Sequence, residues 1–254
     1  MQKNYVIGFP RIGEKRELKK VLERYWAKQT DFNEVIYVAE QLKKRHWNYQ
    51  KEAKIEFISS NDFSYYDNML DTSILLGAIP KRFESLKDEE LYFTMARGNE
   101  TCVAMEMTKW FNTNYHYIVP EISKDTKFNL NSKKVISEYN EAKQMGIDTK
   151  INLIGPITYL GLSKSVDNSD VFLHVNSVVE VYKKLLLEIS ALNSEVVVQF
   201  DEPLFVKDID SKILSLIKPV YDSLCSVSSN IKVVVTTYFE HSNEATKILV
   251  NTPI

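Results

Sequence analysis

Short apolar runs recur along this chain, and each is followed by a longer segment with helical periodicity. The runs at 196–200 and 232–237 are nearly continuous in apolar residues rather than alternating with polar ones. Strands of this kind are typical of a parallel sheet that is covered on both faces. Because repeated strand–helix order implies right-handed crossovers, the pattern predicts an α/β fold, either a closed barrel or an open doubly wound sheet.

Six strands and the helices between them follow from this pattern. The strands are predicted at 5–9, 55–59, 116–120, 151–154, 196–200 and 231–237. The helices are predicted at 14–28, 31–53, 65–76, 88–97, 133–145, 171–192, within 208–224, and at 243–250. A parallel barrel of this type closes with eight strands, and the seventh should begin near 251–254. We therefore expect one domain over 1–254, a TIM (β/α)8-type barrel truncated after about six strands.

Charge and hydropathy exclude several classes of protein. The net charge of −2 gives no overall field that would select a nucleic acid or a membrane surface. No apolar run approaches the roughly 20 residues that a membrane span needs, and the N-terminus has no signal-peptide pattern. We therefore expect a cytoplasmic protein with no nucleic-acid or membrane partner.

The few cysteines, histidines and glycines exclude several kinds of site. The two cysteines, Cys102 and Cys225, form neither a disulfide framework nor a CxxC motif. With 7 glycines and no GxGxxG or GxxxxGKS motif, a phosphate-binding loop is not expected. The four histidines, His46, His116, His174 and His241, have no metal-ligand spacing. His46 and His174 fall within predicted helices and should be surface or half-buried. The sequence predicts no metal site and no catalytic residue of its own.

Segment 11–28 is the first candidate binding site, because it holds seven basic residues against three acidic ones. Its helix should start at the carboxyl end of the first strand, where ligands bind in such folds. Free N–H groups at a helix N-terminus, together with Arg and Lys side chains, suit a carboxylate or phosphate. The alternative is a solvated helix face with Glu–Lys pairs.

Two further segments have polar residues in positions that suit a ligand. Asp201 and Glu202 directly follow a predicted strand, where they could bind substrate or act as acid and base. The alternative is that a carboxylate there accepts backbone N–H bonds. Segment 107–117 is rich in polar and aromatic side chains, and could either line a site for a flat ring with an anionic tail or pack on its own aromatics.

Several motifs occur together in one order along the chain. They are GFPRIG (8–13), RELKK (16–20), MTKWFNTNYHY (107–117), LIGPITYL (153–160), FDEP (200–203) and TTYFE (236–240). In these motifs the chain resembles the N-terminal domain of cobalamin-independent methionine synthase, also called 5-methyltetrahydropteroyltriglutamate–homocysteine methyltransferase.

The resemblance implies a two-barrel enzyme that uses zinc and no cobalamin. Its C-terminal barrel, with the zinc ligands, would lie outside this chain, so the chain alone is predicted to be inactive. The N-terminal barrel would help to bind the polyglutamate tail of 5-methyltetrahydropteroyltriglutamate and would support the catalytic barrel. The tail-binding positions carried over by the resemblance are Arg16, Glu17, Leu18, Lys19 and Lys109.

Two other functions stay open at this point. One is a free-standing barrel enzyme of the same superfamily, such as a decarboxylase or corrinoid methyltransferase, that uses Asp201 and Glu202. The other is a scaffold without a ligand. Binding of a triglutamylated folate would separate the first interpretation from the scaffold.

Overall fold

The computed structural model describes residues 4–254, and for Asn243 it describes the backbone only. The chain divides into two compact units, one formed by Met1–Tyr65 with Val135–Ile151 and the other by Tyr66–Lys134 with Asn152–Ile254. The positions of these units relative to each other are not determined, so each is described by itself.

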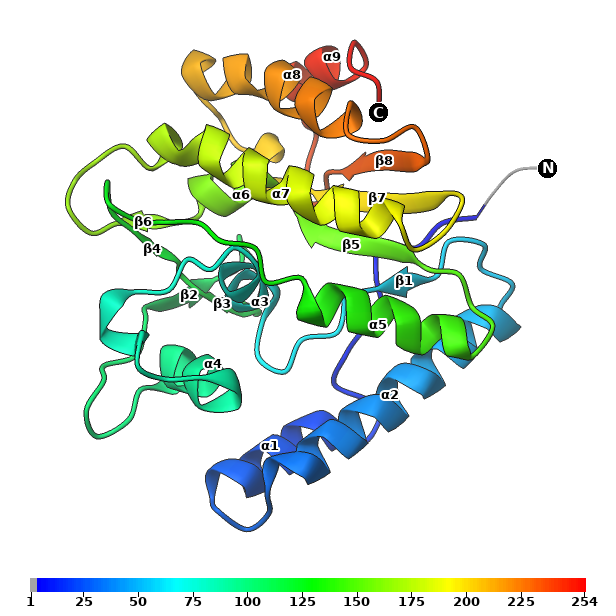
Figure 1. The fold of residues 1–254 in the computed structure, drawn as a ribbon, viewed down its shortest axis with the longest axis vertical. Helices are drawn as coiled ribbons and strands as arrows, with labels where there is room; N and C mark the ends of the chain where they lie inside the picture. Colours follow the sequence, from blue (N-terminus) through cyan, green and yellow to red (C-terminus); the bar gives the residue numbers. More distant parts are fainter. Residues whose placement is uncertain (1–3) are drawn as a thin grey trace. The chain divides into compact units, whose positions relative to one another are not determined.

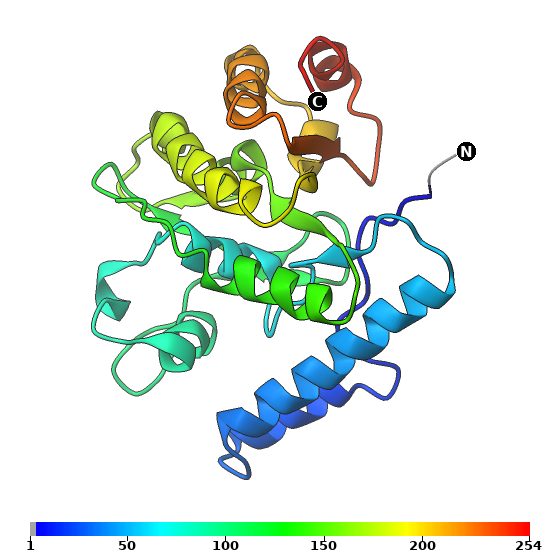
Figure 2. The same ribbon diagram turned by 45° about the vertical axis from the view of Figure 1, so that its right-hand side comes forward.

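In the first unit, two helices lie side by side, as Figures 1 and 2 show. Helix α1 spans Glu17–Trp26 and helix α2 spans Phe32–Glu52. The buried positions of α1 recur at helical spacing, which gives it one apolar face. The predicted capping signal of α2 is confirmed, because the Asp31 carboxylate accepts the N–H of Glu34 at 3.1 Å.

A short piece of parallel sheet completes this unit. Strand β1 (Ser59–Ser60) pairs with the first residues of strand β5 (Lys150–Ile154), and Tyr5 makes a parallel bridge to Phe57. Trp47 of α2 is buried and donates its indole N–H to the Ser59 carbonyl at 2.9 Å. A strand was predicted at 5–9, and within the described residues this segment forms the single bridge at Tyr5.

The second unit contains the remainder of β5, followed in sheet order by β7 (Val196–Asp201) and β8 (Ile231–Thr236). Strands β7 and β8 pair in parallel along their full length, as predicted. Helices α7 (Val175–Ser190) and α8 (Ser211–Cys225) lie next to each other in Figure 2. Tyr182 and Tyr221 of these helices pack their rings against Phe200 of β7. The α/β class with a parallel sheet is therefore confirmed.

The prediction that 116–120 belongs to the main sheet is wrong. Strand β3 (His116–Ile118) instead pairs antiparallel with β2 (Met107–Lys109) in a separate two-stranded sheet. The polar segment between these strands forms a turn, closed by the N–H of Trp110 donating to the Tyr115 carbonyl at 2.7 Å. A local hairpin orders only a short loop, whereas joining the main sheet would have required a long crossover.

The other helices agree with the sequence to within a few residues. They are α3 (Asn68–Leu75), α4 (Asp88–Arg97), α5 (Lys133–Gln144) and α9 (Asn243–Leu249). Elements absent from the prediction are all short. They are helix α6 (Pro156–Gly161), the 3-10 helices η1 (Lys81–Phe83) and η3 (Pro203–Val206), strand β2, and the strand pair β4 (Glu121–Ile122) with β6 (Lys164–Ser165). The first residues of the helix predicted at 171–192 form the 3-10 helix η2 (Val171–His174). Within residues 4–254, no helix is both long enough and apolar enough to cross a membrane.

Candidate functional site

The segment that leads into α1 carries four of the five predicted tail-binding residues. Arg16 is the N-cap of α1 and adopts a left-handed backbone conformation, with φ 58°. The helix therefore begins at Glu17 rather than at Glu14, so Lys15 is outside it. The exposed side chain of Arg16 makes no hydrogen bond or ion pair with any described residue. This geometry leaves the Arg16 guanidinium available to an anion.

Glu17 and Leu18 point into the protein rather than towards a ligand. Glu17 accepts hydrogen bonds from Arg45 of α2 at 2.7 Å and from the N–H of Lys15 at 2.9 Å. Desolvation opposes ionisation of Glu17, but these hydrogen bonds outweigh it and lower the pKa of its carboxyl. Leu18 is 0 % exposed. These two side chains hold the segment in place against α2.

Lys19 lies on the exposed face of α1. Its ammonium is 3.7 Å from the Glu23 carboxylate one turn later, and both side chains are more than half exposed. Such a surface pair contributes only about 0.3–0.5 kcal/mol. A ligand carboxylate can therefore replace Glu23 at little cost.

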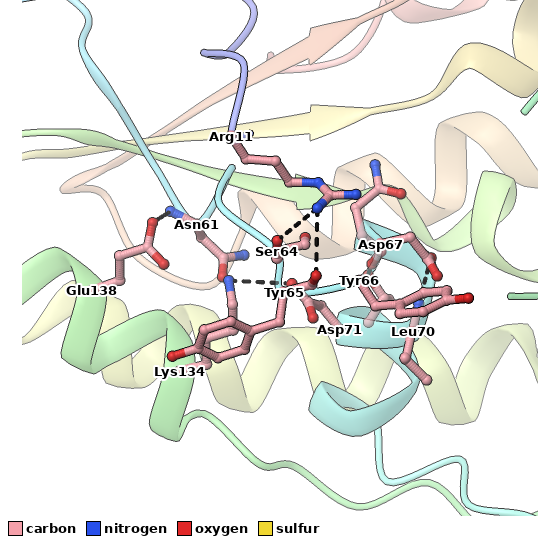
Figure 3. Close-up of polar contacts among 12 residues, drawn as sticks. Arg11, Asn61, Ser64, Tyr65, Tyr66, Asp67, Leu70, Asp71, Lys134 and Glu138 are labelled. Atoms are coloured by element: carbon pink, nitrogen blue, oxygen red, sulfur yellow. Dashed lines mark hydrogen bonds and ion pairs between the residues drawn. The ribbon is translucent and has the colours of Figure 1, made fainter. Parts of the chain in front are cut away.

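The chain before Arg16 is tied to the loop that follows β1, as Figure 3 shows for Arg11. The Arg11 guanidinium donates to the Ser64 carbonyl at 3.1 Å, and the N–H of Phe9 donates to the Asp62 carboxylate at 2.7 Å. Arg11 is thus engaged with backbone carbonyls, whereas Arg16 is not.

Lys109, the fifth predicted residue, ends strand β2 in the second unit. It is exposed and makes no hydrogen bond or ion pair with the described part of the chain. Its cross-strand partner is His116, which is also exposed. On the other face of the hairpin, Tyr117 is buried, and its hydroxyl donates to the Leu162 carbonyl at 3.1 Å. Burial raises the pKa of Tyr117 to about 12, so it stays neutral as a hydrogen-bond donor.

A buried carboxylate holds this hairpin in place. Asp67, the N-cap of α3, accepts the N–H groups of Met69 and Leu70 with one oxygen and that of Ile118 in β3 with the other. Figure 3 shows Asp67 beside Leu70. Burial raises the pKa of Asp67 to about 7, against the opposing effect of these hydrogen bonds. Asp67 therefore links the start of α3 to the strand opposite Lys109.

Aromatic side chains surround the turn of the hairpin. Phe111 lies 5.2 Å from Phe239, which follows β8, and the ammonium of Lys207 lies 4.8 Å from the Phe111 ring centroid. Both phenylalanines have positive φ, 53° and 85°, a strained conformation for a bulky residue. Strain of this kind persists only where packing imposes it. Thus segment 107–117 packs on its own aromatics and those after β8, while Lys109 stays exposed.

Asp201 and Glu202 have different environments at the end of β7. Glu202 is 0 % exposed and accepts hydrogen bonds from the N–H of Ile157 at 3.2 Å, the N–H of Thr158 at 2.7 Å and the hydroxyl of Tyr221 at 2.7 Å. Burial raises its pKa to about 7. Glu202 is thus the carboxylate that accepts backbone N–H bonds, one of the two alternatives left open by the sequence.

Asp201 is also mostly buried, and its carboxylate accepts hydrogen bonds from the side chains of Gln199 at 2.6 Å and Thr236 at 2.5 Å. All three residues lie on β7 and β8. The carboxylate therefore links the carboxyl ends of two parallel strands.

Two of the histidines are more buried than predicted. His46 packs against Phe9, with ring centroids 4.7 Å apart, and His174 lies with Nε2 2.8 Å from the Ser123 carbonyl oxygen. The prediction that both are surface or half-buried is wrong, because the ring of Phe9 packs against His46 and the ring of Phe128 against His174. Among the described residues, no three His, Cys, Asp or Glu side chains are grouped so that they could hold a metal ion.

The model of the protein family described as "Cobalamin-independent synthase, N-terminal domain" matches residues 3–254. The chain belongs to this family. Over 252 residues this synthase domain is 58 % identical to the 5-methyltetrahydropteroyltriglutamate–homocysteine methyltransferase of Desulforamulus reducens. This alignment covers 98 % of the chain and 33 % of the relative. Over 243 residues it is 44 % identical to 5-methyltetrahydropteroyltriglutamate–homocysteine methyltransferase 1 of Oryza sativa subsp. japonica. This alignment covers 93 % of the chain and 32 % of the relative. The synthase domain thus spans about a third of the length of these curated relatives.

A solved structure supports the fold of the synthase domain. It is a B12-independent methionine synthase from Shewanella sp. W3-18-1 in complex with selenomethionine, with a TM-score of 0.58 and 15 % identity. The match covers 87 % of this chain and 58 % of the solved one. At this identity the likeness concerns the fold alone.

Arg16 and Lys19 of the synthase domain lie in the first unit, and Lys109 lies in the second. Sequence reasoning did not single out Asp67, and it named His116 only among the four histidines and within segment 107–117. Asp67 was hidden because the helix was predicted to start at Tyr65, although an aspartate two residues further on is a common N-cap. For His116, the signal was the run of turn-forming residues before it, which predicts a hairpin and therefore a cross-strand partner.

Proposed function

We propose that this chain is part of a methyltransferase that moves a methyl group from 5-methyltetrahydropteroyltriglutamate to homocysteine, giving methionine. The observation that carries the proposal is the 58 % identity, over nearly the whole chain, to a relative named for that reaction. The chain would be the N-terminal barrel domain of a cytoplasmic two-barrel enzyme, inactive without the C-terminal barrel.

In this proposal the domain helps to bind the polyglutamate tail of the folate. Arg16, Lys19 and Lys109 would contact tail carboxylates, and their exposed side chains support that role. Glu17 and Leu18 would shape the site rather than touch the tail, because one is bonded to Arg45 and the other is buried. Each such charge-assisted contact contributes about 0.2–1 kcal/mol where it is fully exposed and about 1.5–3 kcal/mol where it is shielded from water, and a tail in an open groove falls in the lower half of this span.

The methyl-transfer chemistry would belong to residues outside this chain. Zinc, which the family resemblance implies for the full enzyme, can stabilise a thiolate at neutral pH. The described residues of this chain do not fit such an ion, because they offer no suitable group of three ligands. The family is described as cobalamin-independent, so no cobalamin is expected.

A free-standing barrel enzyme that uses Asp201 and Glu202 has less support. Glu202 is fully buried and engaged by three donors, and Asp201 is bonded to two neighbouring side chains. Neither carboxylate has the exposure that a general acid or base needs to reach a substrate.

The test is a titration of the full-length protein with mono- and triglutamylated 5-methyltetrahydrofolate. We expect Lys109→Ala to weaken triglutamate binding about 3–10-fold, which corresponds to about 0.7–1.4 kcal/mol. The effect should shrink with added salt and be much smaller for the monoglutamate. Lys87→Ala is the matched control, because Lys87 is an exposed lysine at the N-cap of α4 in the same unit. Equal losses for both folates, or none for either, would contradict the tail site.

A further inference from the structure

Arg45 of helix α2 holds two carboxylates that flank Arg16 in the sequence. Its Nη2 atom lies 2.7 Å from Oε2 of Glu14 and 2.7 Å from Oε1 of Glu17. Helices α1 and α2 lie side by side within the first unit, as Figure 1 shows. A single guanidinium from a distant position in the chain therefore bridges the residues at 14 and 17.

The backbone between these carboxylates forms a tight turn. Gly13 has φ 82°, and a Cβ there would lie 2.3 Å from Oε2 of Glu17. The N–H of Arg16 donates to the Gly13 carbonyl at 3.0 Å, and the N–H of Lys15 donates to Glu17 at 2.9 Å. Both carboxylates therefore face Arg45 on α2, while the Arg16 side chain is exposed and has no partner among the described residues.

Both carboxylates are ionised at neutral pH. A backbone N–H, the hydroxyl of Tyr49 and the charge of Arg45 lower the pKa of Glu14. Desolvation raises the pKa of Glu17, but hydrogen bonds from Arg45 and from backbone N–H groups outweigh it, so the pKa is lowered. An ionised carboxylate this close to Arg16 competes with a ligand for the guanidinium unless another cation holds it.

With both carboxylates held by Arg45, the turn presents cations to the solvent. The side chains of Lys15, Arg16 and Lys20 are exposed and make no hydrogen bond or ion pair with the described part of the chain. The packing of α1 on α2 does not depend on this ion pair alone, because Leu18 and Leu42 are buried on the two helices. Arg45 therefore has a role to explain beyond joining the helices.

We propose that Arg45 is a positioning residue for the tail site: it neutralises the two neighbouring carboxylates, and so leaves Arg16 unpaired for a carboxylate of the ligand. This inference rests on the proposed function, since it takes the polyglutamate tail as the ligand. Arg45 acts through Arg16 and need not touch the tail. Without its charge, Glu14 and Glu17 would repel an anionic tail and attract the cations of the turn.

The experiment measures triglutamate and monoglutamate affinities of the full-length protein carrying Arg45→Met, Glu14→Gln or both. Arg45→Met should weaken triglutamate binding about twofold to tenfold, as for the loss of two partly exposed ion pairs. This loss should shrink with added salt, because it is a charge effect, and it should be much smaller for the monoglutamate.

Glu14→Gln decides between neutralisation and a purely structural role, and it changes an exposed side chain. It removes one competing carboxylate, so the triglutamate should bind at least as tightly as to the wild type. The double variant should recover part of the affinity lost in Arg45→Met, because only Glu17 is then left uncompensated. If Arg45 merely ties the turn to α2, Glu14→Gln should itself weaken triglutamate binding and the double variant should recover nothing.

Lys44→Met is the matched control, because it removes a neighbouring charge of α2 that lies 3.8 Å from Glu40. Its triglutamate affinity should stay within about twofold of the wild type. A comparable loss in this control would overturn the inference, since any charge on α2 would then suffice.

Failure of this inference is distinguishable from failure of the tail site. If Arg16→Ala weakens triglutamate binding but Arg45→Met does not, the role of Arg45 is wrong and the tail site stands. If Arg16→Ala keeps the wild-type affinity for the triglutamate, the tail site at Arg16 fails as well. A loss in Arg45→Met that is equal for both folates, or that salt does not change, would also overturn the inference.

Discussion

The buried carboxylate of Glu202 makes the stability of the protein depend on pH in a way that one substitution should remove. In the folded state its pKa is raised from 4.5 to about 7 by burial. The folded protein therefore holds a proton on Glu202 up to a higher pH than the unfolded chain does. Because the folded state binds more protons between about pH 4.5 and 7, stability falls as the pH rises through this range and is level above it.

The size of this fall follows from the two pKa values. Their difference, at about 1.4 kcal/mol per unit, is worth about 3 kcal/mol. Glu202→Gln cannot ionise and should lack this fall. Its amide oxygen can still accept from Ile157 and Tyr221, but its amide nitrogen would face the N–H of Thr158, which now donates at 2.7 Å. Two donors facing each other cost about 1–3 kcal/mol.

The assay is chemical denaturation of both proteins from pH 5 to pH 8, followed by far-UV circular dichroism. We expect the variant to be less stable by about 1–3 kcal/mol at pH 5. By pH 8 the gap should have closed by about 3 kcal/mol. Titration of Asp67 is common to both proteins and cancels in the difference.

Glu195→Gln is the matched control, because Glu195 is an exposed carboxylate just before the same strand. Its stability should stay within about 0.5 kcal/mol of the wild type at every pH. If Glu202→Gln and the wild type give parallel curves from pH 5 to pH 8, the reasoning about burial is refuted.

Three further predictions test particular contacts. Asp31→Ala should lower the free energy of unfolding by about 1 kcal/mol, measured by denaturation, because it removes the N-cap of α2. Asp67→Asn should speed hydrogen exchange at the N–H of Ile118 and lower the free energy of unfolding by about 1–3 kcal/mol, because an amide has one acceptor oxygen where the carboxylate has two. Unchanged exchange would contradict the anchoring role of Asp67. Gly155→Ala should be more destabilising than Gly146→Ala. A Cβ at Gly155 would lie 2.1 Å from the Glu202 carboxyl carbon, whereas one at Gly146 meets nothing within 4 Å and costs only the strain of a positive φ, about 1–2 kcal/mol. Equal thermal melting temperatures would count against this.

The amino-acid sequence by itself determined the long elements and the class of the fold. The helices of 10 residues or more were found because each buries one face at helical spacing, as α7 does. Strands β7 and β8 were found because each is a nearly continuous apolar run with few polar residues, although only β7 is buried along almost its whole length. The basic character of the segment around Arg16 and Lys19 was also readable, since charge is a property of composition.

Only the tertiary structure decided the partners of individual side chains. Glu202 and Asp201 are adjacent in the chain, and the sequence could not say that one is enclosed by three donors while the other links β7 to β8. In the same way, the apolar run at 116–120 was compatible with the main sheet until the turn before it paired His116 with Lys109. Both outcomes depend on which groups approach from distant parts of the chain or across a turn. Local propensity describes a residue's own backbone, but burial and hydrogen bonding depend on neighbours that only the folded chain brings together.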